Sequence, residues 1–390
     1  MPSALGDLRI VDFSRVLAGP FATMMLADLG AVVTKIERPG SGDDTRGWGP
    51  PFDAHGTATY FQSVNRNKQS LALDLTDAAD LATARGLATA ADVVVENFRP
   101  GVMDRLGLGE AALRAANPRL VYCSITGFGR GAGADLPGYD LLVQALGGLM
   151  HITGEADGEP QKVGVALVDV LTGLFATVGI LAALRHRDAT GEGQLVEVNL
   201  LSSLLGALVN QASAYTSGGV SPRRMGNRHP SIAPYELLPT ADGELVLAVG
   251  NDRQFRALCG VLGAGALAED PRFTINTARV AHRDALRAAL VAHLAARSAA
   301  DWAVDLTAAR VPAGVVNDVA GAFRLAEALG LAPVVELARA DATTVRLPRN
   351  PIGLSVTPPT YRSAPPPLAD RSPGGCRDRS PGRANGTCGP

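Results

Sequence analysis

The chain has 390 residues, more than one ordinary hydrophobic core supports, so two or three domains are expected. A formal net charge of −2 with 46% hydrophobic residues is typical of a soluble globular protein and excludes a general electrostatic attraction to nucleic acid or to a membrane. Any anion-binding site must therefore be local. The 4 cysteines are widely spaced and form no zinc-type cluster, so we expect neither structural disulfides nor a bound metal.

The first residues show no basic leader ahead of a long apolar segment. No uninterrupted apolar run reaches about 18 residues, the length that crosses a bilayer. We therefore expect a cytoplasmic protein that makes no membrane contact.

The N-terminal pattern predicts a βαβ unit. Residues 8–13 alternate like a strand, residues 20–29 place apolar side chains at helical spacing, and residues 31–36 indicate a second strand. The turn after the first strand has one glycine, Gly19, where dinucleotide-binding folds have GxGxxG, which disfavours a nicotinamide site. Glu37, after the second strand, is then interpreted as a solvated loop acid.

A long polar segment, residues 36–69, follows and is dense in Gly, Pro, Asp and Arg. Loops of this length in compact domains are usually functional or disordered, and the aromatic residues here argue against disorder. Each basic side chain taken singly is typical of solvated surface, but a cluster of them could bind phosphates. The basic residues are Arg38, Arg46, Arg66 and Lys68.

A buried strand at residues 93–95 runs into a polar turn. Ligands bind doubly wound sheets at such strand ends. In this turn Asn97 can hydrogen-bond a base or an amide, Phe98 can stack, and Arg99 can bind a phosphate. With a further strand at residues 120–125, the first 130 residues predict a parallel α/β sheet.

A change of composition at residues 217–230 predicts a domain boundary. We expect a doubly wound α/β domain over residues 1–216, a smaller α+β domain over residues 217–325 and a return segment over residues 326–368. The smaller domain should contain a hairpin that turns at Asp242-Gly243. Residues 369–390 have almost no apolar content and predict a disordered tail.

One acid in the middle of the chain stands out. Asp169 lies in the otherwise apolar run KVGVALVDVLTGLF, residues 162–175. Burying an ionised carboxylate without partners is costly, so Asp169 either has partners or lies in a functional cleft. It could equally be the N-cap of a helix that follows it, and the two interpretations are compatible.

Five motifs, in order, resemble those of the family III CoA-transferases, with which acyl-CoA racemases share a fold. They are RVLAGPFATMMLADLGAVVTKIERPG at 15–40, NRNK at 65–68, ENFRPG at 96–101, GYD at 138–140 and MGNRHPSIAPYE at 225–236. The resemblance covers about residues 8–368. It implies a doubly wound large domain joined to a smaller one, in a homodimer of two interlinked rings.

The resemblance also implies site residues. It places the catalytic aspartate at Asp169, with CoA thioesters as substrates, a small carboxylic acid as acceptor and no permanently bound cofactor. The backbone of Leu17 and Ala18 would stabilise tetrahedral intermediates, and Tyr139 would lie beside the aspartate. The residues implied around CoA are Val16, Arg38, Asn97, Phe98 and Arg105, with Arg46 and Arg99 as further phosphate candidates.

An aspartate suits CoA transfer because, with a reference pKa of about 3.9, it is ionised at neutral pH and needs no base to attack a thioester. The expected intermediates are a mixed anhydride and an aspartyl-CoA thioester. Segments 147–176 and 225–236 look most like members that use dicarboxylates of the succinate or glutarate type. Candidates to bind a second carboxylate are Arg223, Arg224 and Arg228.

Two alternatives stay open. A 2-methylacyl-CoA racemase needs an acid/base pair, and that branch carries histidine where this chain has Tyr139, a poor base. A noncatalytic CoA-binding protein is the second alternative, against which the intact Asp169 argues. His151 and His229 receive no catalytic role.

Overall fold

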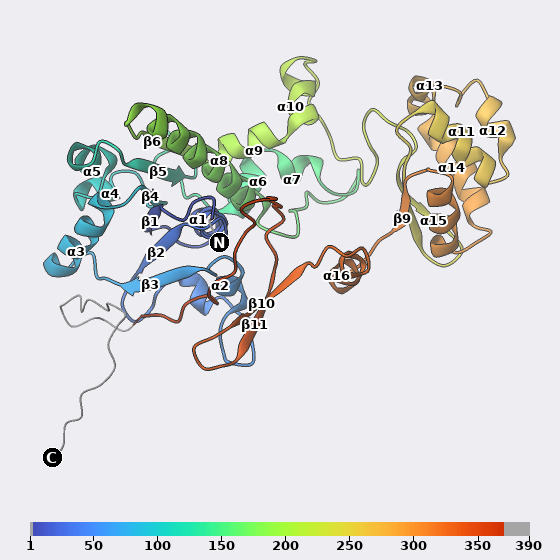
Figure 1. The fold of residues 1–390 in the computed structure, drawn as a ribbon. Helices are drawn as coiled ribbons and strands as arrows, with labels where there is room; N and C mark the ends of the chain where they lie inside the picture. Colours follow the sequence, from blue (N-terminus) through green and yellow to red (C-terminus); the bar gives the residue numbers. More distant parts are fainter. Residues whose placement is uncertain (1–2, 370–390) are drawn as a thin grey trace. The chain divides into compact units, whose positions relative to one another are not determined.

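The computed structural model describes residues 3–369, which form two compact units (Figure 1). The first unit contains the chain up to Pro137, residues Asp169–Leu200 and the chain from Val334 onward. The second contains Gly138–Val168 and Leu201–Pro333. The domain boundaries after residues 216 and 325 stay a prediction, and the predicted tail lies outside the described residues except for Ala369.

Within the described residues, the first unit is built on a parallel sheet of six strands in the order β3-β2-β1-β4-β5-β6. The order reverses between β1 and β4, so this pair is the topological switch point, where doubly wound sheets bind ligands. The predicted α/β class is confirmed. The strands are β1 (Arg9–Asp12), β2 (Val32–Glu37), β3 (Lys68–Ala72), β4 (Val93–Glu96), β5 (Val121–Thr126) and β6 (Leu195–Asn199).

Apolar side chains are buried on both faces of this sheet, as in parallel sheets that carry helices on both faces. Val11, Val94 and Tyr122 pack in one cluster with residues of α3 (Ala78–Thr89) and α5 (Glu110–Ala116). Their neighbours along the strands, including Ile10 and Val95, are buried as well. The other short helices of this unit are η1 (Asp44–Gly47), α2 (Thr59–Ser63) and α4 (Val102–Arg105).

Two longer helices of the first unit meet each other. A Cβ added at Gly173 of α8 (Leu167–Thr190) would lie 2.6 Å from the carbonyl oxygen of Ala18, the first residue of α1 (Ala18–Asp28). Glycine is therefore required at this close approach. Further along α8, a Cβ added at Gly179 would lie 2.7 Å from the side chain of Val196 in β6.

Helix α8 is long and apolar enough to cross a membrane, with a mean hydropathy of 2.1 over 18 residues, which the search for uninterrupted apolar runs missed. The core helix of a soluble protein passes the same test, and 44% of that window is buried here. Leu174, Phe175 and Val178 remain exposed in the structure. These three exposed apolar side chains lie within two turns of α8.

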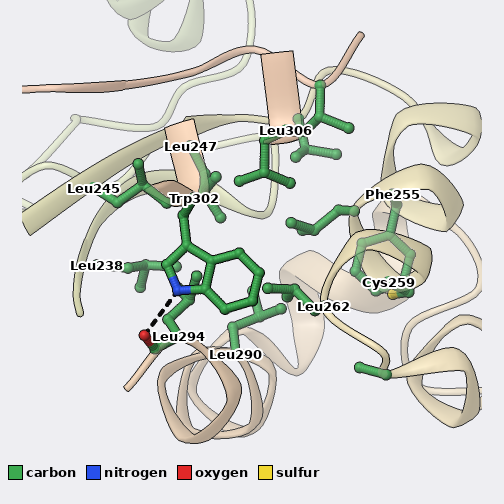
Figure 2. Close-up of a cluster of buried hydrophobic side chains, with 14 of the residues drawn as sticks. Leu238, Leu245, Leu247, Phe255, Cys259, Leu262, Leu290, Leu294, Trp302 and Leu306 are labelled. Atoms are coloured by element: carbon green, nitrogen blue, oxygen red, sulfur yellow. Dashed lines mark hydrogen bonds between the residues drawn. The ribbon is translucent and has the colours of Figure 1, made fainter. Parts of the chain in front are cut away.

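The second unit packs helices around an antiparallel sheet in the order β7-β8-β9. Trp302 lies within its apolar core and donates its Nε1 hydrogen to the carbonyl oxygen of Leu294 at 2.9 Å (Figure 2). The predicted hairpin at Asp242-Gly243 is confirmed. The elements around this core are β7 (Tyr235–Pro239), β8 (Glu244–Ala248), β9 (Ala313–Val315), α11 (Asp252–Val261), α12 (Gly265–Glu269), α13 (Asn276–Ala281), α14 (Arg283–Leu294) and α15 (Ala299–Ala308).

Of the remaining helices in residues 3–369, four precede β7 in the sequence and one follows β9. They are α6 (Asp140–Leu146), α7 (Leu149–Ile152), α9 (Leu200–Ala207), α10 (Val209–Thr216) and α16 (Val319–Ala328). The hairpin of β10 (Val334–Ala338) and β11 (Thr344–Pro348) then returns the chain to the first unit.

Asp28, at the end of α1, anchors the returning chain. Its carboxylate pairs with Arg66 at 2.6 Å and accepts hydrogen bonds from Asn67 at 2.8 Å and Asn350 at 3.1 Å. The backbone carbonyl of Asp28 also accepts from Thr360 at 2.7 Å. Two residues of the NRNK motif therefore hold the fold together.

Candidate active site at the switch point of the parallel sheet

The turns that follow β1 and β4 are joined through Asn97. Its side-chain oxygen accepts a hydrogen bond from the backbone nitrogen of Arg15 at 2.9 Å, and its amide nitrogen donates to the carbonyl oxygen of Arg15 at 2.8 Å. Asn97 thus fixes the geometry of the switch point. Its predicted contact with a ligand stays a prediction.

A cavity of about 290 Å3 opens beside these turns. Its lining combines apolar residues, among them Phe13, Leu73 and Phe98, with charged residues of both signs: Arg15, Lys35, Glu37, Arg38, Asp43 and Asp74. The guanidinium carbon of Arg15 lies 5.3 Å from the centroid of the Phe98 ring, within the range of a cation–π contact. Arg15 is also paired with Asp44 at 3.3 Å, so Phe98 is the group here that suits a flat ring, and Arg38 is the cation that suits a phosphate.

The predicted cluster of basic residues is only partly formed. Arg66 is paired with Asp28, Lys68 with Asp12 at 3.2 Å, and Arg46 with Glu37 at 2.7 Å, so these three cations serve the fold. Arg38 lines the cavity, is exposed, and has no ion-pair partner within residues 3–369. It is therefore available to an anion.

The interpretation of Glu37 as a solvated acid is wrong. Glu37 is 4% exposed, and its carboxylate accepts from Arg46 and, at 2.6 Å, from Ser70. Burial would raise the pKa of Glu37, but Arg46 and Lys35 hold it below its usual value. The partners come from the long loop and from β3, so local sequence could not reveal them.

Arg99 and Arg105 lie elsewhere on the first unit. Arg99 lines a second cavity, of about 220 Å3, together with Glu96, Tyr122 and Arg130. Arg105 is exposed at the end of α4 and lines neither of these two cavities. Their predicted contacts with phosphate stay predictions.

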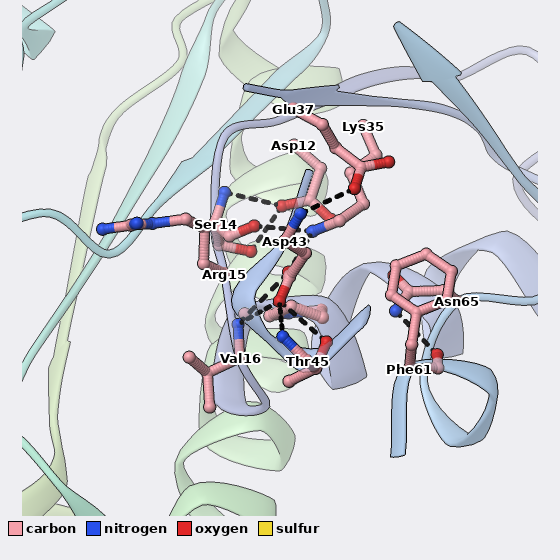
Figure 3. A network of polar contacts seen from close by, with 12 residues as sticks. Asp12, Ser14, Arg15, Val16, Lys35, Glu37, Asp43, Thr45, Phe61 and Asn65 are labelled. Carbon is pink, nitrogen blue, oxygen red and sulfur yellow. Dashed lines mark hydrogen bonds and ion pairs between the residues drawn. The ribbon is translucent and has the colours of Figure 1, made fainter. Parts of the chain in front are cut away.

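The turn after β1 contains a residue with an unusual backbone conformation. Val16 has a φ of 71°, in the left-handed region that β-branched side chains avoid. Its backbone nitrogen donates to both carboxylate oxygens of Asp43, at 3.3 and 3.4 Å (Figure 3). Asp43 also accepts from Thr45, through the backbone nitrogen at 3.0 Å and the hydroxyl at 2.7 Å. Asp43 is thus the hydrogen-bond partner that this strained backbone requires.

Lys35 completes the arrangement beneath the turn. Its ammonium lies 2.8 Å from the Asp43 carboxylate and donates to the carbonyl oxygen of Ser14, also at 2.8 Å. Burial would lower the pKa of Lys35, but the carboxylates of Asp12 and Asp43 raise it. Burial would likewise raise the pKa of Asp43, which Lys35 and Thr45 hold below its usual value. Both groups are therefore charged.

Asp12, at the end of β1, is a second buried acid in this network. Its carboxylate accepts hydrogen bonds from the Ser14 side chain, from Thr23 at 2.6 Å and from Lys68. Burial would raise the pKa of Asp12, but the charges of Lys68 and Lys35 bring it below its usual value.

Asp169 lies in the first turn of α8, which begins at Leu167. The structure thus corrects the expectation that Asp169 precedes its helix as the N-cap. The positive end of the helix dipole favours an ionised carboxylate at this position. Asp169 is half-buried, and Gly173, one turn further on, packs on the first residue of α1. The turn at residues 16–18 therefore lies next to the first turns of α8.

In the second unit, Asp140 supports the chain that leads into α8. Its carboxylate accepts from the backbone nitrogen of Val168 at 2.8 Å and from the side chain of Gln144 at 2.6 Å. Gln144 in turn accepts from the backbone nitrogen of Val163 at 2.9 Å. Asp140 is thus a cap supplied from 28 residues away, which sequence reasoning missed. Tyr139, its neighbour, is 65% exposed, and its place beside Asp169 stays a prediction.

The three arginines proposed for a second carboxylate differ in their surroundings. Arg228 pairs with Asp284 at 2.9 Å, and Arg224 donates to the carbonyl oxygen of His151 at 3.0 Å. Arg223 lines a cavity of about 860 Å3 in the second unit, together with His151 and Met225. Of the three, Arg223 is the one that faces a space large enough for a small acid.

Comparisons with known proteins show which family this chain belongs to. Residues 5–371 match the model of CoA-transferase family III. The chain is 45% identical to the succinate–glutarate CoA-transferase of Agrobacterium fabrum over 363 residues, 92% of this chain and 91% of that protein. It is 43% identical to the acetyl-CoA:oxalate CoA-transferase of Acetobacter aceti over 350 residues, 89% and 88% of the two chains. A crystal structure of a CaiB/BaiF family protein from Brucella suis superposes with a TM-score of 0.84 at 43% identity, covering 94% of this chain and 97% of that one.

Proposed function

Because this chain belongs to CoA-transferase family III and is a CoA-transferase, we propose that it moves CoA from succinyl-CoA or a similar donor to a free dicarboxylic acid through intermediates on Asp169. The observation that carries this proposal is the position of Asp169, a half-buried acid in the first turn of a helix that packs on the turn at the switch point. The names of the similar proteins support the class of acceptor, since they include glutarate and oxalate.

The chemistry needs no redox partner and no net proton transfer. A carboxylate oxygen of Asp169 attacks the donor thioester carbonyl, and the tetrahedral adduct expels CoA as a thiolate, which leaves a mixed anhydride of Asp169 and the donor acid. The thiolate then attacks the Asp169 carbonyl of that anhydride, which releases the donor acid and leaves an aspartyl-CoA thioester. The acceptor carboxylate attacks this thioester, and the thiolate released takes the acceptor acyl group from the second anhydride. Asp169 is thereby regenerated as a carboxylate.

The switch-point cavity is the proposed site of the CoA nucleotide. Its apolar wall with Phe98 suits an adenine ring, and Arg38, with no ion-pair partner within residues 3–369, suits a phosphate. The backbone nitrogens of Leu17 and Ala18, at the start of α1, are proposed to stabilise the oxyanions of the tetrahedral intermediates.

Arg223 is proposed to bind the second carboxylate of the acceptor. A guanidinium binds a carboxylate through two parallel hydrogen bonds, and the 860 Å3 cavity beside Arg223 accommodates a small diacid. A homodimer is also proposed, supported by the apolar surface of Leu174, Phe175 and Val178 on α8. Sedimentation of the wild type and of a Phe175→Glu variant would test the dimer, since a charge at such an interface should separate the subunits.

A panel of acyl-CoA donors and carboxylic acid acceptors, analysed by mass spectrometry, tests the function. We expect exchange that depends on both substrates, and an Asp169 hydroxamate when hydroxylamine traps the enzyme after addition of donor alone. A racemase would instead exchange the α-proton with solvent without needing an acceptor. A noncatalytic CoA-binding protein would do neither, and either result would contradict the proposal.

A further inference from the structure

Three consecutive residues of the turn after β1 have their backbone groups held by side chains from other segments. Lys35 of β2 donates to the carbonyl oxygen of Ser14, Asn97 pairs with both backbone groups of Arg15, and Asp43 accepts from the nitrogen of Val16. The turn leads directly into Leu17 and Ala18. Its shape is therefore set by tertiary contacts and not by its own sequence.

Val16 shows why such support is needed. In the left-handed region its branched side chain clashes with the backbone, so an isolated Val-Leu-Ala segment would populate right-handed or extended conformations instead. A strained residue persists only where its surroundings hold it. The contacts of Asp43 with the Val16 nitrogen, at 3.3 and 3.4 Å, provide that restraint.

The Lys35–Asp43 pair is poorly explained by stability alone. Both side chains are 0% exposed, and apolar residues of similar volume often replace a buried ion pair without loss of stability. Here, however, each partner also hydrogen-bonds the backbone of the same turn, one at Ser14 and the other at Val16. An apolar pair would fill the space but would leave the turn unrestrained.

We propose that Asp43, fixed by Lys35, is a positioning residue that holds Val16 in the left-handed conformation and so preforms the turn for acyl-CoA. The inference rests on the function proposed above for this turn. If the turn adopts its binding-competent shape only part of the time, the apparent Kd for CoA rises in inverse proportion to that fraction. Asp43 itself touches no reacting atom in this scheme.

A double-mutant cycle of Asp43→Asn with Val16→Gly tests the proposal. Glycine adopts a positive φ without strain, so a chain with Val16→Gly needs the restraint much less. We expect Asp43→Asn alone to raise the Kd for CoA about tenfold, and the same change to raise it about threefold or less when Val16→Gly is present. Kd is measured by calorimetry with CoA alone, and kcat and KM for the donor are measured in parallel.

Asp28→Asn is the matched control. It removes the partner of Arg66, another buried cation of the same unit, and the hydrogen bonds of the Asp28 side chain go to Arg66, Asn67 and Asn350, not to the turn. It should lower stability without changing the Kd for CoA. Equal losses of affinity from Asp43→Asn with and without Val16→Gly would overturn the proposal, because Asp43 would then act only by neutralising Lys35.

Folding failures are also informative. If Asp43→Asn unfolds the chain alone but not together with Val16→Gly, strain at Val16 is what Asp43 offsets, and the proposal stands. If both combinations unfold, the ion pair is purely structural and the proposal fails. A wild-type chain that binds CoA but transfers nothing would contradict the proposed function and leave the role of Asp43 intact.

Discussion

The residues beneath the switch point, called here the polar floor, and the core of the second unit are both buried, but the polar floor consists of charged side chains and the core of apolar ones. The first contains Asp12, Lys35, Glu37, Asp43 and Lys68, none more than 4% exposed. The second consists of apolar side chains such as Leu258, Leu290 and Trp302. Burying charge is costly unless every group has partners, whereas apolar burial stabilises without direction. Charges are thus found where backbone turns must be held in a fixed shape.

Arg279 in the second unit follows the same rule. It is 0% exposed, and its guanidinium donates to Asp252 at 2.7 Å and to the carbonyl oxygens of Ala233 and Phe273 at 2.6 and 2.9 Å. Here too a buried charge holds loops in place. Buried charges therefore fix the shape of backbone loops, whereas buried apolar side chains stabilise the fold as a whole. This difference predicts which substitutions will affect activity and which will affect stability.

The largest effect is expected at Asp169, where a substitution should abolish activity without changing stability. Asp169→Asn removes the nucleophile and keeps a side chain of the same shape, so we expect transfer to fall by about 10⁴-fold or more, the scale of nucleophile losses in other enzymes. Urea unfolding should change by about 0.5 kcal/mol or less. A variant that still transfers CoA, or one that unfolds, would assign Asp169 to the fold.

A change in the apolar core should show the opposite pattern. Leu290→Ala, at a 0% exposed position in α14, should lower the free energy of unfolding by about 2–5 kcal/mol through lost burial and a cavity. The Kd for CoA of the folded fraction should not change. Val304→Ala on α15 is the control, because Val304 is 68% exposed. A change in CoA affinity without a loss of stability would break the comparison.

Acid should weaken the polar floor before the apolar core. The folded-state pKa values of Asp12, Glu37 and Asp43 lie below their ordinary values, so their contribution to stability is present at neutral pH and is lost as pH falls through those lowered values. Glu37→Gln should therefore flatten the fall of the unfolding free energy as pH drops below the ordinary pKa of glutamate, 4.5, measured in urea. If the slope of the unfolding free energy against pH does not change, the ion pair of Glu37 with Arg46 contributes nothing to stability.

The smallest effect is expected at Glu96, whose pKa is raised, whereas the pKa values of Asp12, Glu37 and Asp43 are lowered. Burial raises the pKa of Glu96, against hydrogen bonds from Ser124 and the Phe98 backbone. The folded state then holds a proton more tightly than the unfolded one, so stability falls as pH rises from about 4.5 to the raised value. Glu96→Gln should remove that fall and leave the chain equally stable or up to about 1 kcal/mol more stable at pH 7. A loss of stability above that size would mean the charge is needed.

Sequence patterns predicted most elements because strand and helix periods are local. Strand β3, Lys68–Ala72, breaks the local pattern, since it contains a charged residue, Lys68, that is buried inside the sheet by a partner 56 positions away. Similarly, Arg46 and Arg66 resemble solvated cations until the fold supplies Glu37 and Asp28. Pairing across the chain cannot be inferred from one segment.

For the site, the motifs singled out Asp169, Arg38 and the turns as candidates, but they gave no indication of the shape of those turns. Nothing in a valine indicates a positive φ, because the conformation of Val16 depends on Asp43, 27 residues further on. The cap that Asp140 provides for α8 is equally non-local. The sequence indicates which residues are candidates for the site. It does not indicate the hydrogen bonds and ion pairs between distant residues that hold the turns in shape.

The anchoring of the returning chain on Asp28 also bears on how the protein is made. Asn350 reaches Asp28 across 322 positions of sequence. At a synthesis rate of about 5–20 residues per second, the ribosome needs on the order of 15–60 s between these two residues. The strands β2 to β6 are all made within that interval, and until its end Asp28 and Arg66 lack Asn350 and the Pro348 carbonyl. The contacts around Asp28 are therefore complete only after residues 348–360 have been made, well after the last strand of the sheet.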